Sequence, residues 1–365
     1  MLRIAQIAPL MESVPPELYG GTERIVSYLT EELVRQGHDV TLFASGDSNT
    51  AARLVRCSAA ALRLNPEIRD PLPYHVVMLE EVRRRADAFD VLHFHIDLLH
   101  APMVHEFADR TVTTLHGRLD LPDLKPFYRA FDELAVISIS HDQRRPIASA
   151  NWVGNVYHGL PRDVLAFRAP RKGGYLAFTG RITPDKGPDR AIEIATRSGL
   201  PLKIAAKIDK VDQEYWDSVI EPMVHSHPNV EFIGEVNEEE KADFLGNARG
   251  LLFPICWPEP FGLVMIEAMA CGTPVIAFKC GSVPEVIDDG VTGLIVETVD
   301  QAVEAVTRLE FFDRKSVRAA FERRFTVERM AAEYVDVYRS LPGVRESRKP
   351  TVAPRALDGE AVTGP

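Results

Sequence analysis

The chain has 365 residues, of which 45% are hydrophobic and 26% charged, and its formal net charge is −11 at pH 7. A chain of this length is expected to form two domains, and its acidic balance argues against a nucleic-acid binder, because such proteins use Lys and Arg to neutralise phosphates. The same balance disfavours strong docking on an anionic membrane, so we expect at most weak membrane association.

The first half of the chain alternates short apolar runs with segments of helical spacing. Its N-terminal run, 1–10, is short and is followed by an acid and two prolines, which indicates neither a signal peptide nor a membrane span. A helix is predicted over 22–36, and Gly37 is suited to cap its C-terminal end. The expected strands are 3–8, 39–44, 91–95, 111–116 and 134–139, with a further short apolar run at 155–158.

The alternation resumes after residues 159–174, which are predicted to form a linker. The expected strands are 175–179, 202–206, 230–233, 250–255, 274–278 and 293–296, and the expected helices lie near 189–197, 213–224, 238–247 and 284–288, with two or three more up to Leu341. Apolar strands separated by helices favour parallel sheets covered on both faces. The tail 342–365 has little to bury and is predicted to be disordered.

The four cysteines lack the close spacing of metal ligands and indicate free thiols of a reducing compartment. They are Cys57, Cys256, Cys271 and Cys280. We therefore expect a cytoplasmic protein.

Two glutamates eight positions apart, Glu259 and Glu267, lie between an expected strand and the strand from Pro274. Prolines on both sides keep the backbone of Glu259 extended, so this residue is expected on a loop. A helix is predicted to begin near Phe261, and its first amides lack intrahelical acceptors, which makes an anion site. These amides belong to Gly262, Leu263 and Val264. Such a segment suits a ligand with phosphates in the middle and hydroxyls at both ends, for example a nucleotide sugar.

This pair of glutamates resembles the E-x(7)-E signature of the retaining family 4 glycosyltransferases, which have the GT-B fold of two facing Rossmann-like domains. The resemblance covers nearly the whole chain up to about residue 341. It implies that Glu259 contacts the donor sugar, that Glu267 binds the ribose hydroxyls of the nucleotide, and that the helix start between them faces the diphosphate. The donor-binding residues implied there are Phe261, Gly262, Leu263, Val264 and Glu267.

A basic loop follows the first strand of the expected second domain, where residues 180–187 read G-R-I-T-P-D-K-G. Positioned cations stabilise the negative charge that develops on a diphosphate leaving group. The resemblance assigns this role to Arg181 and Lys186. Taken alone, the loop is better explained as a solvated turn, but its agreement with the two glutamates favours a site.

Paired glycines, Gly20 and Gly21, open the first predicted helix and would let a ligand approach the backbone closely. The family has a Gly-rich loop here that closes on the donor phosphates or the acceptor, although a simple turn would have the same sequence. No G-x-G-x-x-G follows the first strand, which counts against a dinucleotide-binding dehydrogenase.

Histidines follow two strands of the first half. His116 ends one strand, and the resemblance places it near the transferred sugar. His93, His95 and Asp97 crowd another strand end, where metal binding is conceivable, but the family neutralises phosphate with Arg, Lys and helix amides. A contact to acceptor hydroxyls, or an ordinary structural role, is therefore preferred for this cluster.

Further positions of the second half correspond less closely to the family. Glu235 lies in a stretch that resembles the one whose backbone contacts the nucleotide base. Lys207 falls near the nucleotide, but alanines precede it where the family has a Gly-rich turn, and His158 lies at the expected domain hinge.

We therefore predict an α/β protein of two Rossmann-like, doubly wound domains facing a cleft, with residues 1–165 binding the acceptor and 166–325 the donor, and a helix, 326–341, that packs back on the first domain. The predicted activity is that of a retaining, metal-independent hexosyltransferase without a cofactor. Its donor would be a nucleoside diphosphate sugar such as a UDP- or GDP-sugar, and its acceptor a sugar, a lipid-linked or a small molecule. Two alternatives remain: a nucleotide-sugar epimerase or hydrolase on the same fold, and a non-catalytic nucleotide-sugar-binding protein.

Overall fold

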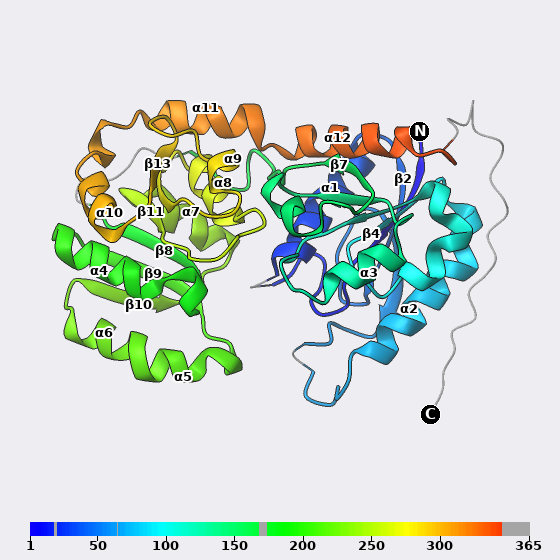
Figure 1. Cartoon of the computed structure of the whole chain (residues 1–365), viewed down its shortest axis with the longest axis horizontal. Helices are drawn as coiled ribbons and strands as arrows, with labels where there is room; N and C mark the ends of the chain where they lie inside the picture. The colour runs from blue at the N-terminus through cyan, green and yellow to red at the C-terminus, as the bar shows by residue number, and fades with distance from the viewer. Residues whose placement is uncertain (18–19, 64, 168–173, 345–365) are drawn as a thin grey trace.

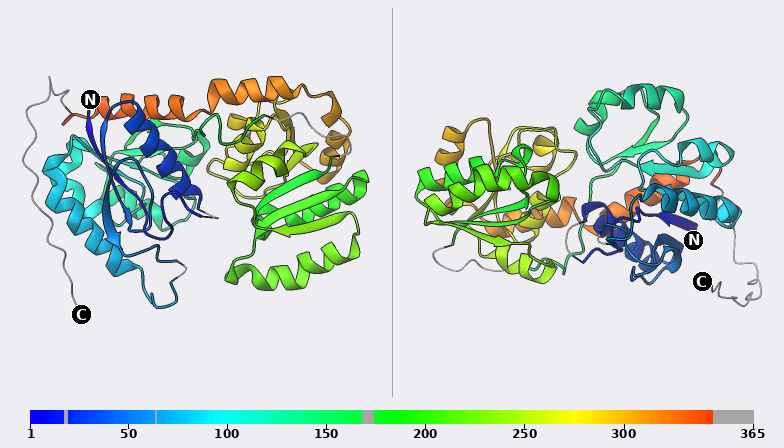
Figure 2. Two further views of the ribbon diagram at one scale, coloured as in Figure 1. Left: turned by 180° about the vertical axis from the view of Figure 1, so that it is seen from behind. Right: turned by 90° about the horizontal axis from the view of Figure 1, so that it is seen from below.

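The computed structural model describes residues 1–17, 20–63, 65–167 and 174–344 (Figure 1). Six residues of the predicted linker, 168–173, and the predicted disordered tail from 345 onward lie outside the described residues. The described chain forms two lobes, each built on a parallel sheet with helices on its faces (Figures 1 and 2). The prediction of two doubly wound α/β domains is thus confirmed.

The first sheet has seven strands in the order β3-β2-β1-β4-β5-β6-β7. The strands are β1 (Arg3–Ile7), β2 (Asp39–Ser45), β3 (Arg53–Ser58), β4 (Val91–Phe94), β5 (Thr111–Thr114), β6 (Val136–Ser138) and β7 (Trp152–Asn155). Its α-helices are α1 (Gly21–Arg35), α2 (Leu72–Arg85) and α3 (Leu124–Ala130), with 3-10 segments at Ala86–Ala88, Ala101–Arg110 and Asp142–Ile147. The apolar run at 155–158 is not a strand of its own, because β7 ends where this run begins.

The second sheet has six strands in the order β10-β9-β8-β11-β12-β13. They are β8 (Leu176–Arg181), β9 (Leu202–Lys207), β10 (Val230–Gly234), β11 (Gly250–Phe253), β12 (Val275–Phe278) and β13 (Gly293–Val296). The helices are α4 (Pro188–Ser198), α5 (Gln213–Tyr215), α6 (Glu221–Ser226), α7 (Glu238–Gly246), α8 (Leu263–Ala270), α9 (Val283–Val286), α10 (Val299–Val306), α11 (Arg314–Arg324) and α12 (Val327–Ser340). A π-helical segment, Trp216–Ile220, joins α5 to α6, and 3-10 segments lie at Pro184–Lys186, Lys210–Asp212 and Leu309–Phe311. In the described part of the chain no helix is both long and apolar enough to cross a bilayer.

The chain crosses between the domains twice, and the two crossing segments are joined by backbone hydrogen bonds. Leu160 accepts a backbone hydrogen bond from Val327 at 3.0 Å and donates one to Phe325 at 2.9 Å. A side chain on the neighbouring Gly159 would meet the carbonyl oxygen of Thr326 at 2.3 Å, so this close approach requires glycine. After the second crossing, α12 runs along the first domain (Figure 1).

Side chains of α12 are part of the interior of the first domain. Tyr334 and Tyr338 are fully buried, and they belong to an apolar cluster that includes Leu29 of α1 and Phe261 of the second domain. A hydrogen bond of 3.1 Å joins the side chains of Gln6 and Tyr338. The last helix therefore packs against the domain from which it is most distant in sequence.

Two acidic side chains of the second domain also bind the first domain. Glu285 accepts hydrogen bonds at 2.7 Å from the backbone amides of His141 and Asp142. Glu238 forms an ion pair with Arg24 at 3.3 Å and a short hydrogen bond with the hydroxyl of Tyr28. These contacts fix the two sheets with their carboxyl ends toward one another, which is where ligands bind in folds of this kind.

Candidate active site

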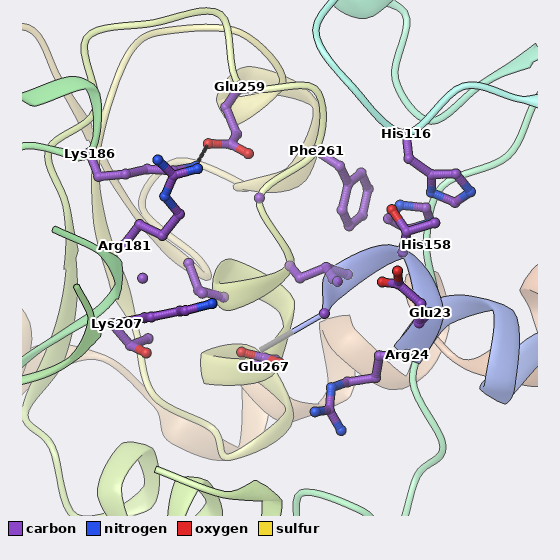
Figure 3. A pocket seen from close by; sticks show the side chains of 18 of the residues that line it. Glu23, Arg24, His116, His158, Arg181, Lys186, Lys207, Glu259, Phe261 and Glu267 are labelled. Atoms are coloured by element: carbon purple, nitrogen blue, oxygen red, sulfur yellow. Dashed lines mark hydrogen bonds and ion pairs between the residues drawn. The ribbon is translucent and has the colours of Figure 1, made fainter. Parts of the chain in front are cut away.

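A cavity of about 510 Å³ lies between the two domains. Its wall is formed by residues that follow the carboxyl ends of strands in both sheets, together with the starts of α1 and α8 (Figure 3). The structure brings together at this cavity every site residue selected from the sequence. They are Gly20, Gly21, His116, Arg181, Lys186, Glu235, Glu259, Phe261, Gly262, Leu263, Val264 and Glu267.

The start of α8 presents its backbone to the cavity. Gly262 precedes the helix in the left-handed conformation, with φ of +79°, and no side chain caps the helix. A side chain at this position would approach Met265 at 2.8 Å and the ring of Phe253 at 3.0 Å. The first amides of α8 lack intrahelical acceptors and carry the positive end of the helix dipole, so this wall is suited to an anion.

The glycines of the first domain face this helix start across the cavity. A side chain on Gly21 would come within 3.5 Å of Leu263, and one on Gly20 would overlap Pro16 at 2.8 Å. The space between the two helix starts is therefore narrow, and a ligand there would contact both domains.

The loop that carries Glu259 is held by the segment before α9. The amide of Ser282 donates to the carbonyl of Glu259 at 3.0 Å, and the Ser282 hydroxyl donates to that of Phe261 at 2.7 Å. The Glu259 carboxylate forms a short ion pair with Lys186 (Figure 3). The Lys186 ammonium also lies 4.7 Å from the centre of the Trp257 ring. Acid and cation are thus oriented as a pair at the edge of the cavity.

A second group of cations lies at the ends of β8 and β9. Arg181 forms ion pairs with Asp212 at 2.8 Å and with Asp209 at 3.2 Å, and Lys207 pairs with Asp209 at 3.0 Å. These aspartates hold both basic side chains at the cavity wall. Lys207 follows alanines where the family has a Gly-rich turn, but in the structure it lines the same wall of the cavity as Arg181 and Lys186.

Glu267 has two oxygens in different situations. One accepts a hydrogen bond from Lys241 of α7 at 2.8 Å. The other, Oε2, is buried and has no hydrogen-bond partner among the described residues. An unpaired buried oxygen of a carboxylate is costly, and Glu267 lines the cavity (Figure 3). Oε2 of Glu267 is therefore placed to accept a hydrogen bond from a ligand in the cavity.

Further charged side chains that were not selected from the sequence also line the cavity. They are Glu23, Arg24, Arg63 and Lys241. Burial raises the pKa of the Glu23 carboxyl, and Arg24 belongs to the interdomain pair with Glu238. Lys241 gives a signal in retrospect, because it lies three and four positions before buried residues of α7 and so shares their inward face.

The histidines of the first domain form part of the opposite wall. The His116 ring is half-buried, and burial lowers its pKa to about 3. It stacks on His158 with ring centres 5.3 Å apart, and His158 contacts Phe261 at 4.9 Å (Figure 3). The side chains of His95 and His116 are hydrogen-bonded at 2.9 Å. Among the described residues no group of three or more His, Cys, Asp or Glu side chains is arranged to hold a metal ion.

Comparison with known families matches both halves of the chain. Residues 19–155 match the family described as Glycosyltransferase Family 4, and residues 166–320 match Glycosyl transferases group 1. An uncharacterized glycosyltransferase of Methanocaldococcus jannaschii is 26% identical over 92% of this chain and 98% of its own length. The O-antigen chain mannosyltransferase C of Escherichia coli is 24% identical over 89% of this chain and 96% of its own length.

Among solved structures, the Anabaena protein HepE in complex with UDP-glucose superposes with a TM-score of 0.71. The alignment covers 93% of this chain and 100% of the Anabaena chain at 19% identity. At this identity the likeness concerns the fold.

Proposed function

Since the chain belongs to glycosyltransferase family 4 and has the GT-B fold, we propose that its donor is a nucleoside diphosphate sugar and that it retains the anomeric configuration of the transferred sugar. The observation that carries this proposal is the buried, unpaired oxygen of Glu267 beside the start of α8. The Anabaena neighbour binds UDP-glucose, which supports a donor of this class. The acceptor hydroxyl would enter from the first domain.

The nucleotide would bind along the second domain. A ribose hydroxyl donates to the Oε2 atom of Glu267, which completes the pairing of this carboxylate. The diphosphate then lies at the uncapped start of α8, and Arg181 and Lys186 contact its oxygens from the basic loop. Because these groups are fixed before the reaction, they stabilise charge on the leaving diphosphate without reorganisation.

The sugar would lie between the Glu259 loop and His116. Lys186 orients the Glu259 carboxylate, which accepts hydrogen bonds from sugar hydroxyls. We infer an attack from the face that the diphosphate leaves, through an oxocarbenium-like transition state, in which the leaving phosphate takes the acceptor proton. Cations and helix amides balance the phosphate charge in this scheme, so a metal ion is not required. Domain closure would exclude water and limit hydrolysis of the donor.

A panel of UDP- and GDP-sugars tests the donor, because the bound sugar nucleotide raises the melting temperature by mass action. With the donor that binds, Lys186→Ala is expected to lower kcat by about 100-fold or more, since it removes a positioned cation from the leaving group. Lys279→Ala is the matched control, because Lys279 forms an exposed ion pair with Glu297 outside the cavity. Near-normal transfer by Lys186→Ala would contradict the assignment.

The two alternative activities give different products. An epimerase or hydrolase would convert the donor without any acceptor, and a binding protein would raise its melting temperature with the donor but turn over nothing. Analysis of the donor after incubation with and without an acceptor panel therefore separates the three.

A further inference from the structure

A chain of buried hydrogen bonds leads away from His116 into the first domain. The Nε2 atom of His116 lies 2.9 Å from Nδ1 of His95, and Nε2 of His95 lies 2.7 Å from the side-chain oxygen of Gln6. The side-chain nitrogen of Gln6 donates to the hydroxyl of Tyr338 at 3.1 Å. One wall of the cavity is thereby connected to α12.

The chain continues on the other side of Tyr338. Its hydroxyl lies 2.7 Å from Nδ1 of His93, and Nε2 of His93 lies 2.8 Å from the hydroxyl of Thr114. Thr114 in turn donates to the hydroxyl of Tyr334 at 3.1 Å. Beyond His116 every member of this chain is at most 2% exposed. We call the side chains from His116 to Tyr334 the histidine relay.

Each imidazole of the relay is neutral and carries one proton. Burial lowers the pKa of His116 to about 3 and holds those of His93 and His95 well below the usual value. A neutral imidazole donates through one nitrogen and accepts through the other. The direction of one hydrogen bond in the relay therefore determines the direction of all the others.

The amide of Gln6 sets this direction. Its oxygen can only accept, so Nε2 of His95 must donate to it, which leaves Nδ1 of His95 as the acceptor from His116. On the other side the Gln6 nitrogen donates to Tyr338, whose own proton then goes to Nδ1 of His93. The donation from Thr114 to Tyr334 agrees with this order, so no donor in the relay faces another donor.

We propose that the histidine relay holds His116 as the Nε2–H tautomer, so that its Nδ1 atom accepts a hydrogen bond from a hydroxyl of the bound sugar. The His116 ring lines the cavity, and Nδ1 has no hydrogen-bond partner among the described residues. Gln6, His95 and Tyr338 are then positioning residues, because they act on the substrate only through His116. The identity of the ligand hydroxyl as that of a donor sugar rests on the proposed function.

This tautomer has a consequence for specificity. A lone pair at Nδ1 that no protein group satisfies favours a sugar with a hydroxyl at this place, because an analogue without it would leave the nitrogen unpaired. It also makes His116 an acceptor rather than a proton donor to the substrate. The arrangement depends on α12, since Tyr338 orients the Gln6 amide.

Nitrogen NMR of the full chain labelled with ¹⁵N-histidine tests the tautomer directly and needs no substrate. The His116 signals are those that disappear in His116→Gln. We expect a protonated Nε2 and an unprotonated Nδ1 at pH 7.5. A protonated Nδ1, or an equal mixture of both forms, would overturn the proposal even if the protein transfers sugar; conversely, an inactive protein with the expected spectrum would refute only the proposed function.

Tyr338→Phe tests the role of the relay. Gln6 then loses the acceptor that orients its amide, so we expect a mixture of His116 tautomers and a kcat about tenfold lower, with KM for the donor changed less than about threefold. Tyr128→Phe is the matched control, because Tyr128 is also buried but its hydroxyl has no partner among the described residues and lies outside the cavity. Should Tyr338→Phe fail to fold, Gln6→Met interrupts the relay at the same point. An unchanged tautomer in the folded variant would show that α12 has no such role.

Discussion

At the scale of single residues, Glu267 shows how a carboxylate can be prepared for a ligand. Lys241 pairs with one of its oxygens, which makes the buried charge tolerable, while the second oxygen lacks a donor. A buried carboxylate oxygen without a hydrogen-bond donor, such as Oε2 of Glu267, destabilises the ligand-free protein. A ligand hydroxyl that supplies the missing hydrogen bond recovers this cost as affinity.

We therefore expect Glu267→Gln to weaken binding of the free nucleoside diphosphate by about 10- to 100-fold, the range for loss of a hydrogen bond to a charged group. Glutamine keeps the shape but has one acceptor oxygen for two partners. Glu239→Gln is the control, since Glu239 is exposed on α7 and does not line the cavity. Calorimetry with UDP and GDP measures the effect, and an unchanged affinity would remove Glu267 from the ribose role.

Sequence spacing placed Glu259 and Glu267 together because both lie in one loop and the helix that follows it, and the structure has both at the cavity. It missed Lys241 and Glu23, whose roles depend on which face of a helix the tertiary fold turns toward the cavity. The local pattern around Glu23 does not differ from that of an ordinary surface helix, and the spacing of Lys241 indicates only that it shares the inward face of α7. The same limit applies to the histidine relay, whose members come from four strands or helices far apart in sequence.

At the scale of elements, the start of α8 depends on one backbone conformation. Gly262 has φ of +79°, a region that other residues adopt only with strain. Its place between Phe253 and Met265 leaves little room for a side chain. The direction of the first amides therefore depends on this glycine.

Gly262→Ala is expected to lower the free energy of unfolding by about 1–3 kcal/mol and to weaken nucleoside diphosphate binding as well, because the amides of α8 are displaced. Gly37→Ala separates the two effects: Gly37 has φ of +84°, nothing within 4 Å of an added side chain, and no place in the cavity. It should cost stability but leave affinity unchanged. Urea unfolding and calorimetry measure the two quantities, and equal affinities in both variants would contradict a role for the α8 start.

The strands and α-helices that were not predicted all belong to the first domain, and they are β3, α2, α3 and most of β7. β3 lies at the end of the first sheet with only Val55 buried among its six residues, and α2 beside it leaves Val76 and Val77 exposed. Central strands buried on both faces give continuous apolar runs, whereas a half-covered edge strand gives a weaker pattern. In the first sheet the prediction therefore recovered the centre better than the margins, whereas the edge strands β10 and β13 of the second sheet were both predicted.

At the scale of the whole molecule, α12 ties the end of the chain to the interior of the first domain. Its tyrosines belong to a polar network, not only to an apolar core. The network includes the three histidines His93, His95 and His116, and burial keeps them neutral in the folded state. Stability of the molecule should therefore respond to pH in a range where most proteins change little.

Burial strongly lowers the pKa of five histidines in this region, namely His93, His95, His100, His116 and His158. The unfolded chain takes up protons below pH 6.5 while the folded protein does not, so stability falls as the pH drops from 6.5 toward the folded pKa values. At one pH unit below 6.5, each of these histidines lowers the free energy of unfolding by about 1.4 kcal/mol. The carboxyls of Glu12 and Glu23, whose pKa values burial raises, oppose this effect.

We thus expect the urea midpoint of unfolding to decrease clearly when the pH is lowered from 7.5 to 5.5. The histidines of the unfolded chain titrate within this interval, whereas most carboxyls of the unfolded chain stay ionised. His100→Gln should reduce the slope, since an amide can keep the hydrogen bond to Thr113, 2.6 Å from His100 Nε2, without titrating. His105→Gln is the control, because His105 lies on the surface. A midpoint that is the same at both pH values would mean that the interior of the first domain accepts protons on its histidines, and the single-proton logic of the relay would fail with it.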